Sequence, residues 1–312
     1  MTKPKVVIQS TWPETGDWLE AFRTQAPDLD VTIWPDVGAP EAVSAAVVWF
    51  PPQEMLDAMP ALRVLCSLGA GVDHIIARDL RLPDVPITRL VDPLMSQRVS
   101  HYVLSAVCRH HRMLDVYQRD QIAGRWQPQA HKDTHAFVVG VLGLGEIGTT
   151  CAQLLRAAGY PVLGWSRSPK IVDGVETYAG PEGLRACLAR IDALVSLLPL
   201  TRETRGLIDR DLLSRMPKGG YVINAGRGDQ VVLDDLIAAL DSGQLSGASL
   251  DVLPQEPLPA DHPLWHRDDV LITPHIAGLS NPVTGARVII EQIRSALAGR
   301  TPAHTVDRAR GY

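Results

Sequence analysis

The chain has few cysteines and no apolar stretch of membrane-spanning length. Its four cysteines, Cys66, Cys108, Cys151 and Cys187, are isolated and form no Cys-x-x-Cys pair, which excludes the usual cysteine-based redox and zinc motifs. No apolar run approaches the roughly 18 residues that a transmembrane helix requires. The N-terminus leads directly into a strand pattern, so we expect no secretory signal and no membrane partner. The pattern of isolated cysteines fits a reducing, cytoplasmic setting.

Concentrated positive charge is absent as well. The formal net charge is −5, and the basic residues are scattered, which argues against a nucleic-acid partner. Two histidine groups, His110-His111 and His131 with His135, have no cysteine or carboxylate cluster at metal-ligand spacing. We therefore interpret them as polar surface or loop histidines and expect no metal site. The length of 312 residues and the apolar fraction of 46% suit about two globular domains.

The first hundred residues alternate between strand and helix patterns, which is typical of a parallel sheet covered by helices. A helical pattern over residues 96–121 can carry the chain from one domain to the next, and the polar loop 122–135 has the composition of a boundary. The later strands of a second sheet are predicted at 193–197, 221–224, 247–251 and 270–272, followed by a helix over 283–297. The expected strands of the first part are 5–9, 31–34, 45–49, 64–67 and 87–90, with helices at 17–24 and 54–58 between them.

A glycine-rich turn in mid-chain points to a dinucleotide. It follows a strand pattern over 136–142, has glycines at 143, 145 and 148, and leads into a helical pattern that ends at Gly159. In a dinucleotide site these glycines allow the tight turn, the approach of the pyrophosphate and the close packing of helix on strand. The N–H groups at the helix N-terminus then bind the phosphates. The predicted contacts are Gly143, Leu144, Gly145, Glu146, Ile147 and Gly148; the alternative is a glycine-rich turn in another α/β domain.

The acidic residue that usually ends the second strand of such a site is missing. The strand pattern over 161–165 is followed by Ser166-Arg167-Ser168, and Lys170 adds a second cation. An acid would accept hydrogen bonds from the ribose hydroxyls and repel a 2′-phosphate, whereas hydroxyls and a guanidinium bind that phosphate. We therefore predict that NADPH is preferred over NADH. The alternative is a solvated basic loop with no cofactor role.

Three polar side chains follow three apolar strands of the second domain. Arg227 comes after 221–224, Glu256 after 247–251 and His275 after 270–272. Strand ends of this kind open on the cofactor crevice of a doubly wound sheet. Arg227 can bind a substrate carboxylate and polarise the adjacent carbonyl, His275 can donate a proton, and Glu256 can orient the imidazole and favour its protonated form. Each residue alone is as readily explained by a solvated loop; their joint placement favours an active site.

The chain resembles the D-isomer-specific 2-hydroxyacid dehydrogenases along nearly its whole length. The fingerprint at 143–148, the Leu198-Pro199-Leu200-Thr201 loop and the runs 224–228, 251–257 and 274–275 carry this resemblance. The segments 49–52, 68–73, 125–128, 165–168 and 306–312 are similar to those of the glyoxylate/hydroxypyruvate reductase A subfamily. That subfamily reduces glyoxylate to glycolate and hydroxypyruvate to D-glycerate with NADPH. A basic residue often follows its catalytic histidine, but 276–281 contains none, which leaves substrate size and charge open.

The resemblance implies further roles. Arg227, Glu256 and His275 become the catalytic residues, a glycine-rich loop at 69–72 offers N–H groups to the substrate carboxylate, and the chain forms a homodimer. Trp49 and Trp126 are expected to wall the substrate pocket, although core or interface packing explains both equally well. The expected substrate contacts are Trp49, Gly69, Ala70, Gly71, Val72, Met95 and Trp126, and the additional cofactor contacts are Leu198, Pro199, Asn224, Ala225, Asp251, Ala277 and Gly278.

The predicted architecture is α/β, with two doubly wound parallel-sheet domains and a cleft between them. A flavodoxin-like substrate-side domain is expected at 1–98 and 282–312, and a Rossmann cofactor domain at 99–281. The active site is expected in the cleft, since ligands bind beyond the carboxyl ends of the strands. The predicted function is NADPH-dependent reduction of small 2-keto acids to D-2-hydroxy acids. The alternatives are an NAD-dependent D-2-hydroxyacid dehydrogenase with another substrate and a non-catalytic dinucleotide sensor.

Overall fold

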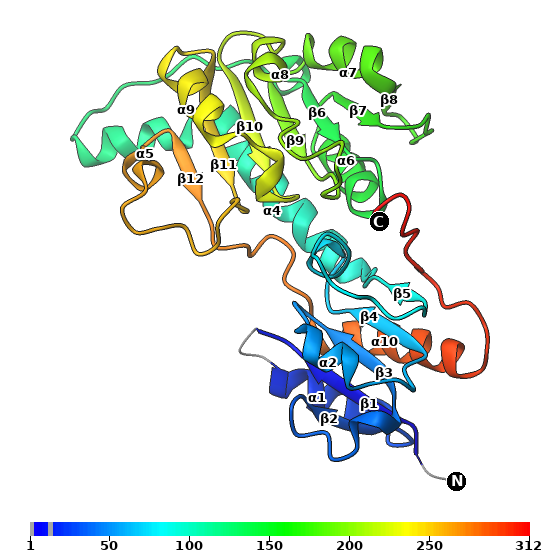
Figure 1. Ribbon diagram of the computed structural model, residues 1–312. Coiled ribbons are helices and arrows are strands. Elements are labelled where there is room, and N and C mark those ends of the chain that lie inside the picture. The colour runs from blue at the N-terminus through cyan, green and yellow to red at the C-terminus, as the bar shows by residue number, and fades with distance from the viewer. Residues whose placement is uncertain (1–2, 12–14) are drawn as a thin grey trace. The chain divides into compact units, whose positions relative to one another are not determined.

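The chain divides into two compact units. The computed structural model describes residues 3–11 and 15–312, with unit 1 formed by 1–95 and 280–312 and unit 2 by 96–279 (Figure 1). The sequence prediction places the divisions at 98/99 and 281/282, whereas the compact units divide at 95/96 and 279/280. The polar loop 122–135 lies inside unit 2 and not at a boundary, because the chain has already entered the second unit along the helix before it.

Unit 1 is built on a five-stranded parallel sheet with the order β2-β1-β3-β4-β5, the order of flavodoxin-like folds. The C-terminal segment of the chain returns to this unit and supplies its last helix. The strands are β1 (Lys5–Gln9), β2 (Asp30–Ile33), β3 (Val43–Val48), β4 (Val64–Ser67) and β5 (Ile87–Thr88); the helices are α1 (Thr15–Gln25), α2 (Gln53–Asp57), α3 (Asp73–Ile76) and α10 (Pro282–Leu297).

Both faces of this sheet are covered, which explains why its strands read as continuous apolar runs. In β1, Val6 and Ile8 belong to the core that contains Phe22 of α1 and Ile289 of α10. Val7 points to the other face, into the core that α2 and α3 complete. Because side chains alternate along a strand, one apolar run contributes residues to the hydrophobic cores on both faces of the sheet.

Unit 2 contains a seven-stranded parallel sheet with the order β12-β11-β10-β9-β6-β7-β8. Counted from β6, this is the doubly wound order of dinucleotide-binding domains with one strand added. The strands are β6 (Val139–Leu142), β7 (Val162–Ser166), β8 (Glu176–Ala179), β9 (Ala193–Ser196), β10 (Gly220–Asn224), β11 (Leu245–Leu250) and β12 (Val270–Ile272); the helices are α4 (Pro93–His111), α5 (Leu114–Ile122), α6 (Glu146–Ala157), α7 (Gly180–Leu188), α8 (Arg210–Ser214) and α9 (Leu233–Asp241).

Helices again cover both faces of the sheet in unit 2. Val139 and Val141 of β6 share a core with residues of α4 and α6. Leu142 and Leu194 belong to the opposite core, which α7, α8 and α9 close. The carboxyl ends of the parallel strands consequently emerge at one edge of the sheet, where the polar residues singled out in the sequence follow them.

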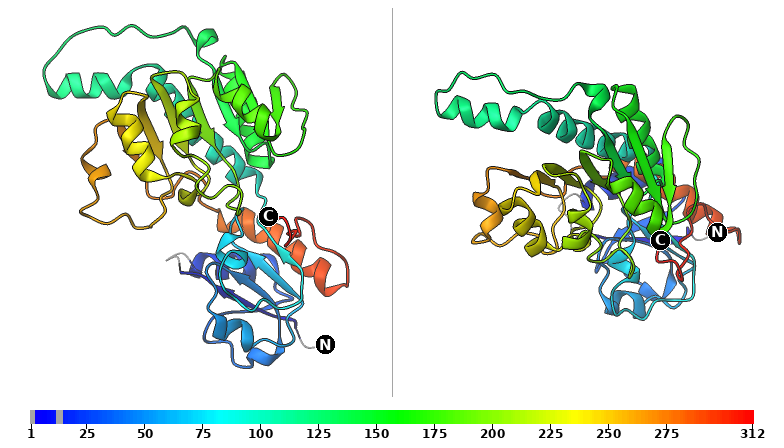
Figure 2. Two further views of the ribbon diagram at one scale, coloured as in Figure 1. Left: turned by 45° about the horizontal axis from the view of Figure 1, so that its top comes forward. Right: turned by 90° about the horizontal axis from the view of Figure 1, so that it is seen from above.

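Two local features differ from the sequence prediction. The helix expected over 96–121 is broken into α4 and α5 by Met113, whose backbone is left-handed with φ 57°. Figure 2 shows α5 and the loop up to residue 135 extending away from the sheet of unit 2. Strand β8 has no counterpart in the prediction, since its four residues at the sheet edge are polar or only partly buried. Of the residues described, none belongs to a helix with the length and apolarity to cross a bilayer.

Candidate active site

The turn between β6 and α6 has no room for side chains at two of its glycines. Gly143 has φ +99°, and a Cβ atom there would lie 2.8 Å from the carbonyl oxygen of Leu197. A Cβ atom at Gly148 would lie 1.7 Å from the carbonyl oxygen of Gly143, far inside contact distance. The turn and the first helical residues therefore pack against each other in the way the glycine spacing predicts.

At Gly145, the remaining glycine of the turn, the space is open. Nothing lies within 4 Å of a Cβ atom built at Gly145, which is exposed and forms the N-cap of the 12-residue helix α6 without a side-chain capping bond. Glu146 is exposed and Ile147 half-buried, whereas Leu144 is buried. An uncapped helix N-terminus beside open space fits a pyrophosphate, because backbone N–H groups and the helix dipole attract anions there.

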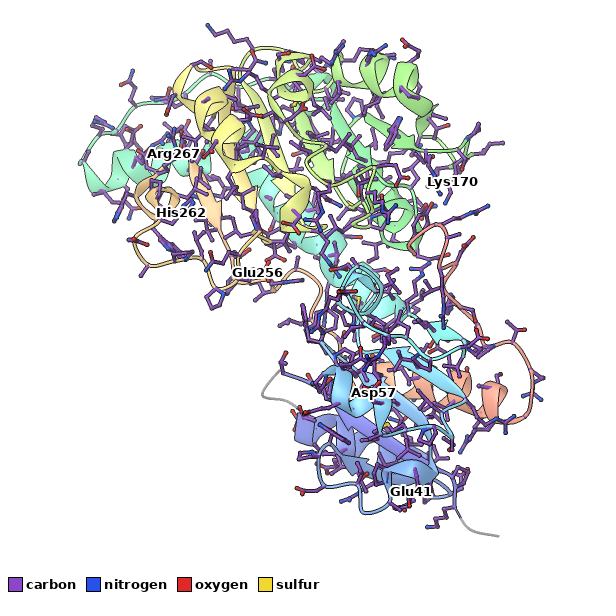
Figure 3. All side chains as sticks on the ribbon, viewed as in Figure 1. Glu41, Asp57, Lys170, Glu256, His262 and Arg267 are labelled. Atoms are coloured by element: carbon purple, nitrogen blue, oxygen red, sulfur yellow. The ribbon has the colours of Figure 1, made fainter. Side chains whose placement is uncertain are left out.

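Hydroxyl and cationic groups surround the end of β7. The buried Ser166 hydroxyl donates to the Ser168 carbonyl at 2.7 Å, while Arg167 and Ser168 are exposed. The Lys170 ammonium donates to the Leu144 carbonyl at 2.6 Å and so lies at the fingerprint turn (Figure 3). No acidic residue ends this strand, so the site presents donors and positive charge where a ribose-binding acid would otherwise stand.

The turn after β10 that contains Arg227 is stabilised by hydrogen bonds among its own residues. The buried Asn224 amide donates to the Arg227 carbonyl at 2.9 Å and accepts the Gly226 N–H at 3.1 Å. The Arg227 guanidinium donates to the Gly226 carbonyl at 2.9 Å. Asn224, predicted as a cofactor contact, thus uses its side chain to shape the turn. Gly228 permits the close approach of this turn to Leu253, since a Cβ atom there would lie 1.9 Å from the Leu253 carbonyl carbon.

Gln230 is a residue of this site that the sequence prediction missed. It is fully buried, and its Nε2 donates to the carbonyls of Leu198 at 2.8 Å and Pro199 at 3.1 Å. Its Oε1 accepts the Ser196 hydroxyl at 2.8 Å. The amide therefore ties the Leu198-Pro199 loop to the Arg227 turn. The only hint in the sequence that Gln230 belongs to the site is its position three residues after Arg227. Only its burial in the structure distinguishes it from a solvated loop glutamine.

His275 and Glu256 form a direct pair. The Nδ1 atom of His275 lies 2.9 Å from Oε2 of Glu256, and Oε1 of Glu256 accepts the Leu253 N–H at 3.0 Å. The side chains remain 26% and 39% exposed, respectively, so small molecules can reach them. Glu256 lies in the loop after β11, and Figure 3 shows it well separated from Lys170. The pair joins loops that follow two neighbouring strands.

The charges at this pair favour an ionised carboxylate. Burial raises the pKa of the Glu256 carboxyl, but the hydrogen bond and charge of His275, the Leu253 N–H and the charge of Arg227 outweigh burial and leave that pKa below its ordinary value. Arg227 therefore acts electrostatically on the carboxylate that pairs with His275. A carboxylate ionised at neutral pH accepts a hydrogen bond from the imidazole and so holds the ring in one orientation.

Asp251 is buried under the turn that carries His275. Its two carboxylate oxygens accept the N–H groups of Ile276 and Ala277, each at 2.9 Å. Asp251 and Ala277, both predicted as cofactor contacts, thus bind each other in the structure. The other predicted contacts Ala225, Gly278 and Pro199 are half-buried at strand ends or in the adjoining loops, and Leu198 is buried.

The predicted carboxylate loop of unit 1 is fastened by Ser67. The Ser67 hydroxyl accepts the Gly69 N–H at 3.0 Å and lies within donating distance of the carbonyls of Gly69 and Gly71. Since the Gly69 N–H is engaged, the candidate donors of this loop are those of Ala70, Gly71 and Val72. The Trp49 ring packs against Gly69 and lies 4.1 Å from the His74 ring between centroids.

Two of the predicted substrate contacts lie in very different surroundings. Met95 is 4% exposed and belongs to the core formed with α1 and α10. Trp126 is 99% exposed in the extended loop after α5. Among the described residues, no hydrogen bond or ring contact joins Trp126 to Arg227, Glu256 or His275.

Comparison with known proteins identifies the family of the chain. Residues 104–277 match the family model of the NAD-binding domain of D-isomer-specific 2-hydroxyacid dehydrogenases. A D-isomer-specific 2-hydroxyacid dehydrogenase from Xanthobacter autotrophicus Py2, solved with NADPH and MES, is 43% identical over 100% of both chains with a TM-score of 0.95. The protein belongs to this family. It is therefore an oxidoreductase, and its unit 2 is the dinucleotide-binding domain.

Two further solved structures are similar over the full length. An NADPH-dependent glyoxylate/hydroxypyruvate reductase from Sinorhizobium meliloti, in complex with NADP and sulfate, is 35% identical over 99% of this chain and 100% of its own, with a TM-score of 0.93. A probable 2-hydroxyacid dehydrogenase from Rhizobium etli CFN 42, in complex with NADP, HEPES and L(+)-tartaric acid, is 34% identical over 100% of both chains, with a TM-score of 0.91.

Proposed function

We propose that this dehydrogenase uses NADPH to reduce small 2-keto acids to D-2-hydroxy acids, glyoxylate to glycolate and hydroxypyruvate to D-glycerate. The observation that carries the proposal is the contact of 2.9 Å between His275 and Glu256, together with the charge of Arg227 on the same carboxylate. This arrangement provides a proton donor beside a cation that suits a carboxylate. The similarity to the reductase of Sinorhizobium meliloti supports the choice of substrates.

Three observations support NADPH as the cofactor. The open N-terminus of α6 at Gly145 suits a pyrophosphate. The end of β7 carries Ser166, Arg167 and Ser168 in place of an acid, which suits a 2′-phosphate. Similar proteins were crystallised with NADPH or NADP. We assign the phosphate contacts to Arg167 and Ser168, and a supporting charge at the turn to Lys170.

Each side chain has one task in the proposed reaction. Arg227 binds the substrate carboxylate and polarises the adjacent carbonyl. Because Nδ1 of His275 is engaged by Glu256, proton donation to the carbonyl oxygen falls to Nε2. Glu256 orients the imidazole through this contact. When bound, the reduced nicotinamide supplies the hydride that the keto carbon accepts.

The remaining roles are extensions of this proposal. We assign additional binding of the substrate carboxylate to the N–H groups of Ala70, Gly71 and Val72, and a wall of the substrate site to Trp49. The enzyme is proposed to act in the cytoplasm as a homodimer.

A substrate panel tests the function. NADPH oxidation is measured with glyoxylate, hydroxypyruvate, pyruvate, phenylpyruvate and longer 2-keto acids, and the panel is repeated with NADH. We expect the highest kcat/KM with glyoxylate or hydroxypyruvate and NADPH. A higher kcat/KM with NADH and another keto acid would assign the enzyme to the NAD-dependent alternative, and NADPH binding without any turnover would indicate the sensor.

The variant Arg167→Ala should weaken NADPH binding by about 10- to 100-fold, because it removes a charge-assisted fork to the 2′-phosphate. NADH binding should change little, since NADH lacks that phosphate. Dissociation constants are measured by quenching of tryptophan fluorescence. The matched control is Arg185→Ala, which removes an exposed arginine paired with Glu182 on α7. Equal losses of affinity for NADPH and NADH would show that Arg167 does not bind the 2′-phosphate.

A further inference from the structure

The turn that carries His275 has a backbone conformation that needs support. His275 has φ 55°, in the left-handed region that side chains with a Cβ atom rarely adopt. Its N–H donates to the carbonyls of Asp251 at 2.8 Å and Thr273 at 3.0 Å. A strained residue persists where its surroundings determine its conformation, so the groups around this turn decide where the imidazole points.

Asp251 provides that support from below the turn. It is buried, and its carboxylate accepts the N–H groups of Ile276 and Ala277, one on each oxygen. These are the two residues directly after His275. The carboxylate and the Asp251 carbonyl thus hold three successive N–H groups of the turn. A buried carboxylate in turn needs hydrogen-bond donors to keep its charge and orientation.

A third donor reaches Asp251 from the other side of the turn. The Thr273 hydroxyl donates to Oδ1 of Asp251 at 2.6 Å, and the Tyr102 hydroxyl lies 2.9 Å from the same threonine oxygen. Because a threonine has one hydroxyl proton and Asp251 receives it, Tyr102 must be the donor to Thr273. Burial raises the pKa of Tyr102, so the phenol stays protonated and able to donate. The chain of donors runs from α4 through Thr273 to Asp251.

We propose that Thr273 and Tyr102 are positioning residues for His275, an inference that rests on the proposed role of His275 as proton donor. They contact neither the imidazole nor Glu256 in the hydrogen bonds of the described residues. Successive hydrogen bonds polarise one another. The phenol of Tyr102 and the hydroxyl of Thr273 therefore fix the orientation of the Asp251 carboxylate, which accepts the N–H groups of Ile276 and Ala277. When Thr273 loses its hydroxyl, the buried carboxylate lacks a donor and reorients, and the imidazole loses its alignment.

The variants Thr273→Val, Thr273→Ser and Tyr102→Phe test this inference. Valine has the shape of threonine without the hydroxyl, and serine restores the hydroxyl. A matched control is Tyr221→Phe, since the Tyr221 hydroxyl lies 2.8 Å from the Ser249 hydroxyl. That pair is another buried tyrosine–hydroxyl contact of unit 2, and it touches neither Asp251 nor the His275 turn in the described contacts.

Two readouts are measured on the full-length enzyme. We expect kcat with glyoxylate to fall about 10- to 100-fold in Thr273→Val, with a change in KM below about threefold, because misalignment of a proton donor affects the chemical step. Thr273→Ser should restore most of kcat, and Tyr102→Phe should lose about 3- to 10-fold. Hydrogen exchange of the Ile276 and Ala277 amides should accelerate about 10-fold in Thr273→Val. Tyr221→Phe should leave kcat and the exchange of these amides unchanged.

The exchange readout separates this inference from the proposed function. If the wild-type enzyme reduced no 2-keto acid while Thr273→Val still accelerated amide exchange, the function would be wrong and the positioning of the turn would stand. Unchanged kcat and unchanged exchange in Thr273→Val would overturn the inference. A loss of kcat in Tyr221→Phe equal to that in Tyr102→Phe would also overturn it. If Thr273→Val did not fold, Tyr102→Phe with its control would decide the outcome alone.

Discussion

Replacement of His275 by glutamine lowers kcat for glyoxylate by about 10²- to 10⁴-fold, the range that a general acid contributes. Glutamine keeps a hydrogen-bonding group near Glu256 but cannot deliver a proton to the carbonyl oxygen. In the wild type, the contact of 2.9 Å with Glu256 holds the imidazole ring in place. KM should change less than kcat, since the proton is transferred only as the carbonyl is reduced.

The measurement is NADPH oxidation at saturating glyoxylate, with NADPH binding followed separately by fluorescence. His266→Gln is the matched control, since His266 is an exposed histidine of the same unit with no place in the proposed reaction. We expect both variants to bind NADPH normally and only His275→Gln to lose turnover. A variant at His275 with near-normal kcat would remove it from the mechanism and with it the central argument for reduction.

Arg227→Ala is the second large effect. We expect kcat/KM for glyoxylate to fall about 10²- to 10³-fold, because the change removes both the fork that binds the carboxylate and a charge that stabilises the developing oxyanion. Arg227→Lys should recover only part of this loss, since an ammonium keeps the charge but not the planar fork. The effect should appear in KM as well as in kcat, in contrast to His275→Gln.

Steady-state kinetics over a range of glyoxylate concentrations measure this effect. Arg205→Ala is the control, because Arg205 pairs with Asp229 in the turn that follows Arg227 and lies outside the proposed reaction. Addition of guanidinium ions should partly restore turnover in Arg227→Ala and leave the control unchanged. If Arg227→Ala and Arg227→Lys kept kcat/KM within about fivefold of wild type, a carboxylate clamp at this position would be untenable.

Periodicity and turn chemistry predicted much of the fold. Strands β1 and β4 have the predicted bounds, and the glycines at 143 and 148 occupy positions where a Cβ atom would clash. The break of the long helix at Met113, whose φ is 57°, was not predicted, because no proline or glycine marks it. Strand β8 was missed because a short edge strand buries too little surface to need an apolar pattern.

The candidate site likewise contains residues that the sequence could predict and residues that it could not. Arg227, Glu256 and His275 could be named from the sequence because each follows an apolar strand, and parallel strands bring their carboxyl ends to one edge. Gln230 could not, because a fully buried amide and a solvated one have the same local sequence. Asn224 and Asp251 were named as cofactor contacts, while the structure shows that their polar atoms hold the turns of Arg227 and His275.

The sequence alone determined that the protein has two parallel-sheet domains, a dinucleotide fingerprint without its acid, and three candidate catalytic side chains. These features are local: strand and glycine patterns depend on neighbours in the chain, and the family motifs are contiguous. The sequence suggested that Glu256 pairs with His275, and the structure gives their contact a length of 2.9 Å. Only the tertiary structure decided that Tyr102, Thr273 and Asp251 form one chain of hydrogen bonds that ends at the His275 turn. Hydrogen bonds depend on the distance and direction between atoms, and residues 102, 251 and 273 meet only after helix α4 has packed against the sheet.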